Sequence, residues 1–490
     1  MEKRFILAID QSTAGTKALL IDHDGNIQSK SYASHSQIHP QLGWVEHDPM
    51  EILANVRMLI EQLLAQAAVS AAEIQCLAIT NQRETVLAWD RETGKPVYNA
   101  IVWQCSRAGD QCQRIRDLGM EEQVKAKTGL PLSEFFSAAK LAWIMDNVEH
   151  ARALKAEGRL LCGTVDSWLV WNLSREKNHI TDYSNASRTQ LMDLQTLRWD
   201  DTLLEAFGLS AVMMPRILFS DQVVGHLCLD GCQIPIAGVI GDSHGALFAQ
   251  CGLGTGIKVT YGTGSSVMAG TGPDKLSSTG LATTVSYACG GKVNFAIEGN
   301  INSTGATVKW LTDQLQLLPS AGDAEAMATE LDGNGGVYFV PAFSGLGAPH
   351  WAPDAKALLT GMTFDTDKRH IVRAALESIA YQITDVVKAI EADTGLAFDS
   401  LMVDGKPTEN RFLMEFQASL CGKTIVRNRV EEASAYGSAL LAGLGTGFWQ
   451  TADLDRLIRH GTIFSPCLSQ EQVDALYDGW CKAIALAKMA

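Results

Sequence analysis

The same local pattern opens each half of this 490-residue chain. Residues 5–9 are apolar, Asp10 and a turn rich in Ser, Thr and Gly follow, and a second apolar run covers 18–21. The pattern returns as a predicted strand at 257–261, the turn Gly262-Thr263-Gly264-Ser-Ser266 and another predicted strand from Val267. A strand, a polar turn and a strand repeated in this way indicate an internal duplication with a cleft between the halves.

Strands and helices alternate through both halves, which predicts an α/β fold. A single hydrophobic core does not reach this chain length, so we expect more than one domain. The glycine-rich stretch 251–256 is the best candidate boundary and divides the chain into domains 1–250 and 251–490. Predicted strands lie at 74–80, 160–165, 234–240 and 401–404, and predicted helices at 49–67, 136–147, 167–173, 369–390, 411–420 and 433–444.

The composition excludes several classes of partner. A net charge of −15 without a long basic block argues against nucleic acid and anionic membrane surfaces. No apolar run approaches a membrane-spanning length, and the first one is too short for a secretory signal. The 11 cysteines are scattered singly, which is typical of reduced thiols. We therefore expect a cytoplasmic protein without membrane insertion.

A carboxylate, Asp242, follows the apolar run 234–240. Gly241 and Gly245 are expected to bracket a tight turn, with a helix from Ala246. Ligands of α/β sheets bind where strands end. We therefore predict that Asp242 is a general base that takes a proton from a substrate hydroxyl, with ATP and a small polyol or sugar positioned against it.

Other segments carry groups suited to these ligands. The first polar turn offers N–H and hydroxyl donors to a phosphate, Lys17 adds positive charge, and Asp10 can hold Mg²⁺ through water. The helix that opens at Gly305 could direct its N-terminus at a nucleotide. Arg83 and Glu84, at the end of a strand, could grip vicinal hydroxyls. A ligand-free polar turn and a surface ion pair remain the alternatives for these stretches.

Taken in order, these landmarks resemble the FGGY carbohydrate kinases, and most closely the members that phosphorylate glycerol. The resemblance spans nearly the whole chain, and the colinear order of the motifs makes it specific. Ser137-x-x-Lys140-Leu-x-Trp143 is similar to part of the family's first signature. The other matching segments are Ile9-Asp-Gln11, Gly43-Trp-Val-Glu-His-Asp-Pro49, Ile79-Thr-Asn-Gln-Arg-Glu-Thr85, Tyr98-Asn-Ala-Ile-Val-Trp-Gln-Cys105, Gly163-Thr-Val-Asp-Ser-Trp168, Asp182-Tyr-Ser-Asn-Ala-Ser-Arg188, Tyr261-Gly-Thr-Gly264 and Pro341-Ala-Phe-Ser-Gly-Leu-Gly-Ala-Pro349.

The resemblance implies two ribonuclease-H-like domains of the actin and hexokinase type, with the active-site cleft between them. It implies ATP-dependent phosphorylation of a primary hydroxyl of glycerol or a related small polyol or sugar, with Asp242 as base and Mg²⁺ near Asp10 and Asp242. It leaves a homodimer or homotetramer open. The implied substrate contacts are Arg83, Glu84, Trp103, Phe135, Asp242, Ser243 and Ser266, and the implied nucleotide contacts are Thr13, Gly15, Thr16, Lys17, Gly262, Thr263, Gly264, Gly305, Lys309, Gly405, Lys406 and Asn410.

Four positions depart from the pattern of the glycerol-phosphorylating members. Lys17 stands in place of an Arg and loses the bidentate fork. Phe135 stands in place of a Tyr, so one hydrogen bond to the substrate is missing. Ser266 stands in place of a Phe, which enlarges the pocket and adds a hydrogen-bond donor to it. Lys406 stands where a second Gly is expected and could crowd the adenine or strain the turn. The pocket changes favour, as an alternative, a four- or five-carbon polyol or ketose such as erythritol, xylulose or ribulose.

Two alternatives come from other classes. Gly241-Asp-Ser243-His-Gly245 has the Gly-x-Ser-x-Gly pattern of a serine hydrolase, with Ser243 as nucleophile. A catalytically silent sugar- or nucleotide-binding protein with the same fold is the second. His244 either tunes Asp242 or packs within the turn, and packing is the favoured interpretation.

Overall fold

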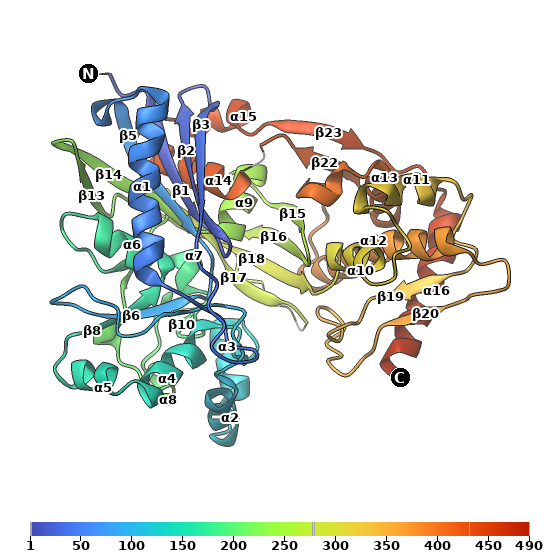
Figure 1. The fold of residues 1–490 in the computed structure, drawn as a ribbon, viewed down its shortest axis with the longest axis horizontal. Helices are drawn as coiled ribbons and strands as arrows, with labels where there is room; N and C mark the ends of the chain where they lie inside the picture. Colours follow the sequence, from blue (N-terminus) through green and yellow to red (C-terminus); the bar gives the residue numbers. More distant parts are fainter. Residues whose placement is uncertain (1, 277, 279, 431, 490) are drawn as a thin grey trace.

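Two mixed β-sheets, one in each half of the chain, organise the fold (Figure 1). The computed structural model describes residues 2–489 except 277, 279 and 431. The first sheet has the order β13-β14-β5-β1-β2-β3, in which β14, β5 and β1 are parallel and the other pairs antiparallel. Its strands are β1 (Phe5–Gln11), β2 (Gly15–Asp22), β3 (Ile27–Ser34), β5 (Ile74–Asn81), β13 (Gly225–Leu229) and β14 (Cys232–Gly241).

The second sheet repeats this topology. Its order is β17-β18-β16-β15-β21-β22-β23, with an antiparallel meander of β15, β16 and β18 followed by the parallel strands β21 and β22. The predicted duplication is therefore visible as two sheets with the same order of meander and parallel strands. The strands are β15 (Gly256–Tyr261), β16 (Ser265–Gly272), β17 (Ala282–Cys289), β18 (Lys292–Ile301), β21 (Ser400–Asp404), β22 (Thr424–Asn428) and β23 (His460–Phe464).

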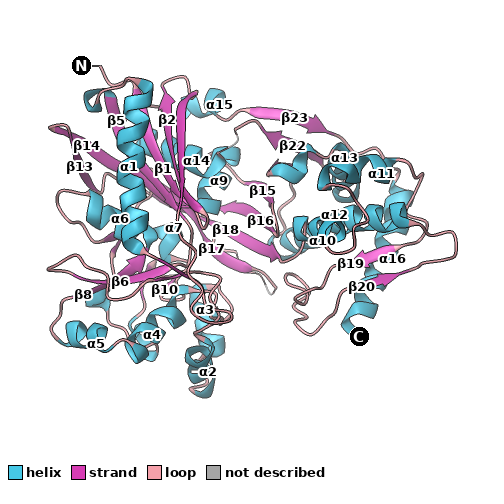
Figure 2. Ribbon diagram, in the orientation of Figure 1, coloured by secondary structure: helices cyan, strands magenta, loops and turns pink. Residues whose placement is uncertain are grey.

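Helices cover both faces of the first sheet (Figure 2). Alternate residues of β1 and β2 face opposite layers, because side chains along a strand alternate between its two faces. One layer is the core with α1 (Pro49–Ala67) and α6 (Val165–Leu173). The other contains α9 (Asp242–Cys251) and α14 (Ala433–Gly445). Helix α14 thus comes from the second half of the sequence but packs against the first sheet.

The second sheet has its own core, built on the long helix α12 (Lys368–Thr394), whose apolar face follows the predicted periodicity. Its other helices are α10 (Gly305–Asp313), α11 (Ala324–Thr329), α13 (Arg411–Cys421) and α16 (Gln470–Met489), with the hairpin β19 (Tyr338–Val340) and β20 (Leu358–Thr360). A short helix, α15 (Leu454–Leu457), precedes β23.

A smaller sheet, β4-β7-β6-β8, extends the first half below its main sheet in Figure 1. Within the described ranges, none of the helices combines the length and apolar character needed to cross a bilayer. The remaining elements are β4 (Glu46–His47), β6 (Val86–Asp90), β7 (Ala100–Ile101), β8 (Leu160–Thr164), β9 (Ile180–Asp182), β10 (Met192–Asp193), β11 (Arg198–Trp199), β12 (Arg216–Leu218), α2 (Gly109–Asp117), α3 (Glu121–Thr128), α4 (Ser137–Asn147), α5 (Glu149–Ala156), α7 (Tyr183–Ala186) and α8 (Asp201–Ala206).

Candidate active site

Asp242 is the first residue of α9 and directly follows β14. The predicted tight turn between Gly241 and Gly245 is wrong, because the helix begins at Asp242 and Gly245 lies inside it. A Cβ on Gly437 of α14 would come within 1.8 Å of the Gly245 carbonyl oxygen. The glycines therefore permit close packing of α9 on α14, and close packing, not a turn, accounts for Gly245.

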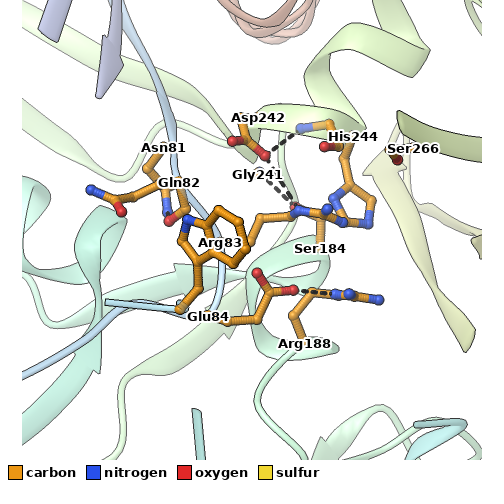
Figure 3. Close-up of polar contacts among 12 residues, drawn as sticks. Asn81, Gln82, Arg83, Glu84, Ser184, Arg188, Gly241, Asp242, His244 and Ser266 are labelled. Carbon is orange, nitrogen blue, oxygen red and sulfur yellow. Dashed lines mark hydrogen bonds and ion pairs between the residues drawn. The ribbon is translucent and has the colours of Figure 1, made fainter. Parts of the chain in front are cut away.

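The Asp242 carboxylate remains accessible, with 31% of the side chain exposed. Its Oδ1 accepts a hydrogen bond of 2.5 Å from the N–H of Ser243. The carboxylate lies at the N-terminal end of α9, where the helix dipole is positive. The preceding N–H, that of Gly241, donates to Ser184 Oγ at 2.9 Å and fixes the junction of strand and helix. The position fits a base at the end of a strand (Figure 3).

Arg83 and Glu84 follow β5, the neighbour of β14, and lie beside Asp242 (Figure 3). The Nε of Arg83 is 3.3 Å from Asp242 Oδ1, and the Arg83 side chain is 8% exposed. Glu84 has a φ of +60°, and the Arg83 carbonyl accepts from the N–H of Thr85 at 2.8 Å across it. A non-glycine residue in this region of φ is strained, and such strain concentrates at functional sites.

Two further charged residues, Arg188 and Glu298, complete this cluster and were not among the predicted site residues. Arg83 donates to both Glu298 oxygens, at 2.8 and 3.1 Å, and Arg188 Nε donates to Glu84 Oε1 at 2.6 Å. Burial raises the pKa of Glu298, but the guanidinium groups of Arg188 and Arg83 outweigh it and hold this pKa well below its usual range. The sequence feature that could have identified Glu298 is its position as a single acidic residue after apolar strand residues, in Phe295-Ala-Ile-Glu298.

Aromatic side chains form one wall beside the cluster. Trp103 donates from Nε1 to Thr13 Oγ1 at 2.9 Å, and its ring meets that of Phe135 edge to face at 5.5 Å. The ammonium group of Lys140 donates to the carbonyls of Phe135 and Phe136, which fixes the backbone behind the ring. The predicted substrate residues Trp103 and Phe135 are thus neighbours, and Trp103 also contacts the first polar turn.

Ser266 lies on β16, and its hydroxyl donates to Glu298 Oε1 at 3.0 Å. The substitution of a small polar residue at this position was expected to add a donor to the pocket. The hydroxyl hydrogen is instead directed at Glu298, so Ser266 offers its lone pairs as acceptors. Ser266 is therefore coupled to the buried cluster.

Asp10, near the end of β1, is a further acidic residue of the site. Burial raises its pKa to about 7, with Lys17 opposing and the charges of Asp242 and Glu432 adding to the effect. Its Oδ1 is buried without a hydrogen-bond partner. An unpartnered carboxylate oxygen near a second carboxylate fits Mg²⁺, which prefers oxygen ligands. Among the described residues, no three acidic, His or Cys side chains form a metal cage.

Lys17 lies in β2, and its ammonium group contacts Glu432 Oε2 at 2.6 Å. Burial lowers the pKa of Lys17, but the hydrogen bond to Glu432 and the nearby charges outweigh it and leave this pKa raised. Its positive charge is thus shared with the residue before α14. Gly15 and Thr16 belong to the same strand and not to the turn, and the side chain of Thr16 is fully buried. Of the predicted residues Thr13, Gly15 and Thr16, Thr13 is the one that lies in the turn, where it contacts Trp103.

On the opposite side, the turn at 262–264 is docked on the N-terminus of α10. The N–H groups of Gly305 and Ala306 donate to the carbonyls of Gly262 and Thr263, each at 3.0 Å. Thr263 itself is exposed. A cavity of about 600 Å³ is lined by this turn, the start of α10, Lys309 and Lys406. Lys309 forms an ion pair with Asp313 one turn later, so its charge is partly neutralised.

A second cavity, of about 410 Å³, adjoins the first through Gly305 and Lys406 and also contains Asn410. Gly405 has a φ of +98°, and a Cβ there would lie 1.9 Å from the Tyr261 carbonyl oxygen, so only glycine fits. Lys406 has no left-handed φ, so it does not strain the turn. Asn410 caps α13 by accepting from the N–H of Leu413 at 2.8 Å.

The hydrolase alternative finds no support in the geometry. A nucleophile elbow holds its Ser on a strained turn and next to a basic His. Ser243 instead lies in the first turn of a regular helix, without a positive φ. His244 is fully buried, with Nε2 3.3 Å from Thr284 Oγ1, and burial holds its pKa well below the usual range. His244 is therefore buried beside the charges of Arg83 and Glu298, in agreement with the packing interpretation.

Comparison with known proteins agrees with this geometry. Residues 5–249 match the N-terminal domain, and residues 257–446 the C-terminal domain, of the FGGY family of carbohydrate kinases. The glycerol kinase of Paraburkholderia phymatum is 46% identical over 495 residues, which cover 100% of this chain and 99% of that protein. The glycerol kinase of Citrobacter koseri is 44% identical over 494 residues, covering 99% and 98%.

Solved structures show the same similarity. The crystal structure of Plasmodium falciparum glycerol kinase with ADP has a TM-score of 0.94 at 34% identity and covers 99% of both chains. A xylulose kinase from Rhodospirillum rubrum, at 21% identity, shares the fold with a TM-score of 0.87 over 99% of both chains. Both family domains and the full-length relatives lead to one conclusion: this chain belongs to the FGGY family of carbohydrate kinases and is an enzyme of that family.

Proposed function

We propose that this protein catalyses the ATP-dependent phosphorylation of a primary hydroxyl of glycerol, with Asp242 as the general base. The observation that carries the proposal is the partly exposed Asp242 carboxylate at the start of α9, held by Arg83 and flanked by Glu84. Full-length similarity to the glycerol kinases of P. phymatum and P. falciparum supports glycerol as the substrate.

Different residues bind the substrate and accept its proton. Arg83 donates to a polyol hydroxyl, Glu84 accepts from another, and the rings of Trp103 and Phe135 cover the carbon chain. The primary hydroxyl loses its proton to Asp242 while its oxygen attacks the γ-phosphorus, and ADP departs. A positioned general base of this kind contributes roughly 10²–10⁴-fold to the rate. Alignment of the reactants and exclusion of water supply much of the rest.

The nucleotide would bind in the two adjoining cavities of the second half. Thr263 and Gly305 would contact the phosphates, and Asn410 would border the base, with Gly405 in the turn just before Lys406. When bound, Mg²⁺ would neutralise phosphate charge near Asp10 and Asp242. We accordingly assign the substrate and the base to a domain of residues 1–250 and the nucleotide to a domain of residues 251–490.

A steady-state panel tests the proposal. Glycerol, erythritol, xylulose and ribulose are each supplied with MgATP, and the phosphorylated product is measured directly. We expect the highest kcat/KM with glycerol. A higher value for a four- or five-carbon substrate would favour the second candidate, which rests on the small side chain of Ser266 and the missing hydroxyl at Phe135. Inactivity with all four would refute kinase function on small polyols and favour a silent binding protein.

Two coarser expectations accompany this function. We propose that the enzyme acts in the cytoplasm, where ATP and small polyols are available and where single, unpaired cysteines stay reduced. A homodimer or homotetramer is the expected assembly, and light scattering coupled to size-exclusion chromatography would distinguish either from a monomer.

A further inference from the structure

Five charged side chains of alternating sign form a continuous chain at the base of the site. In order they are Asp242, Arg83, Glu298, Arg188 and Glu84, and each contacts the next. Both ends of the chain belong to the proposed substrate and base residues. Glu298 is the central member and the only one of the five contributed by the second sheet, through β18. The substrate residues of the first half are therefore tied together by a carboxylate of the second half.

The contacts of Glu298 are close and fully buried. Its oxygens accept from Arg83 Nη1 at 3.1 Å and from Nη2 at 2.8 Å, and Arg188 Nη1 lies 3.0 Å from Oε2. The side chain of Glu298 is 0% exposed, and that of Arg188 is 1% exposed. A bidentate pair of this kind fixes the plane of a guanidinium group as well as its position. With that plane fixed, the remaining guanidinium nitrogen of Arg83, Nε, lies 3.3 Å from Asp242 Oδ1.

The surroundings give Glu298 a rigid place. Ser266 on β16 donates to Glu298 Oε1, so the adjoining strand holds the same carboxylate. Nearby, Ser187 and Thr284 share a hydrogen bond of 2.6 Å across the contact between α7 and β17. This hydrogen bond attaches β17, the edge strand of the second sheet, to the first half of the chain near the cluster. Ser266, in the same domain, thus holds the Glu298 carboxylate, and the carboxylate in turn contacts Arg83 and Arg188 of the other domain.

We propose that Glu298 is a positioning residue for the phosphoryl transfer: it orients Arg83 directly, and Glu84 through Arg188, so that both meet the polyol hydroxyls in a fixed geometry. This inference rests on the proposed polyol kinase function and adds a residue that does not itself touch the substrate. Without Glu298, the two guanidinium groups lose their shared partner. Arg83 is then free to turn further toward Asp242 and away from its polyol hydroxyl, and Arg188 no longer holds Glu84 in a fixed position for the other hydroxyl.

Two substitutions test the proposal. Glu298→Gln keeps the shape of the side chain and removes its charge, whereas Glu298→Asp keeps the charge and withdraws it by one methylene. We expect the KM for the polyol to rise at least tenfold in Glu298→Gln and by a smaller factor in Glu298→Asp. The KM for ATP should stay within twofold in both, because the nucleotide cavities do not include this residue. A merely structural role would lower the fraction of active enzyme and leave both KM values unchanged.

Glu377→Gln is the matched control. Glu377 is also a buried carboxylate of the second half, on the core helix α12, where Arg373 Nε donates to it at 2.8 Å. The Glu377→Gln variant should leave the polyol KM unchanged. If Glu298→Gln does not fold, Glu298→Asp carries the test. If the wild type is active and the Glu298 variants that fold have the wild-type KM for the polyol, the role of Glu298 is refuted while the proposed function stands. A wild type that phosphorylates no polyol overturns the proposed function, and the inference with it.

Discussion

Replacing Asp242 by Asn separates catalysis from binding at this site. The substitution keeps the size of the side chain and an oxygen that can accept a hydrogen bond, but the amide cannot accept the proton. Loss of a general base costs roughly 10²–10⁴-fold in rate, or about 3 to 5 kcal/mol of barrier. Binding should suffer far less, because Arg83 keeps its bidentate pair with Glu298 at 2.8 and 3.1 Å.

The stability of the fold should also change little. Asp242 is 31% exposed and contacts Arg83 at 3.3 Å, and partly exposed ion pairs contribute roughly 0–1 kcal/mol. Single-turnover quench experiments would measure the transfer step, and isothermal titration calorimetry the polyol affinity. We expect kcat to fall by at least about 100-fold, with polyol affinity changed by less than about tenfold. A variant that keeps more than about a tenth of the wild-type kcat would show that Asp242 is not the base.

Three further substitutions address stability, specificity and nucleotide binding. Burial raises the pKa of Asp166 from 3.8 to about 6, so its charge costs the folded state nothing below pH 3.8 and about 3 kcal/mol above pH 6. Asp166→Asn should therefore raise the free energy of unfolding at pH 8 by up to that amount, and by about half as much at pH 5, as urea titrations at both pH values would show. Ser266→Phe fills the space beside Glu298 and should raise the KM for erythritol relative to that for glycerol; an unchanged ratio would mean that this position does not select chain length. Lys406→Gly opens the nucleotide cavity that Lys406 lines and should lower the KM for ATP, and a higher KM would instead indicate that the ammonium group binds the nucleotide.

Much of the fold could be predicted because its elements are locally encoded. Helix α1 begins and ends at the predicted residues, Pro49 and Ala67, since Asp48 caps it and apolar residues recur on one face. The duplicated hairpins were likewise visible as strand, polar turn and strand. The start of α9 was not, because the sequence does not reveal that Gly245 meets the backbone of α14 almost 200 residues later.

The site residues also differ in how far the sequence could predict them. Asp242 follows β14, and Arg83 and Glu84 follow its parallel neighbour β5. Carboxyl ends of parallel strands meet at one edge of a sheet, so the proximity of these residues could be inferred from sequence. Glu298 comes from the other sheet, and only the packing of two domains brings it to Arg83. Its burial makes sense only in that packing, since a carboxylate without partners in an apolar strand would carry a large desolvation cost. Local patterns thus predict which groups can react, whereas the contact between domains determines how those groups are held.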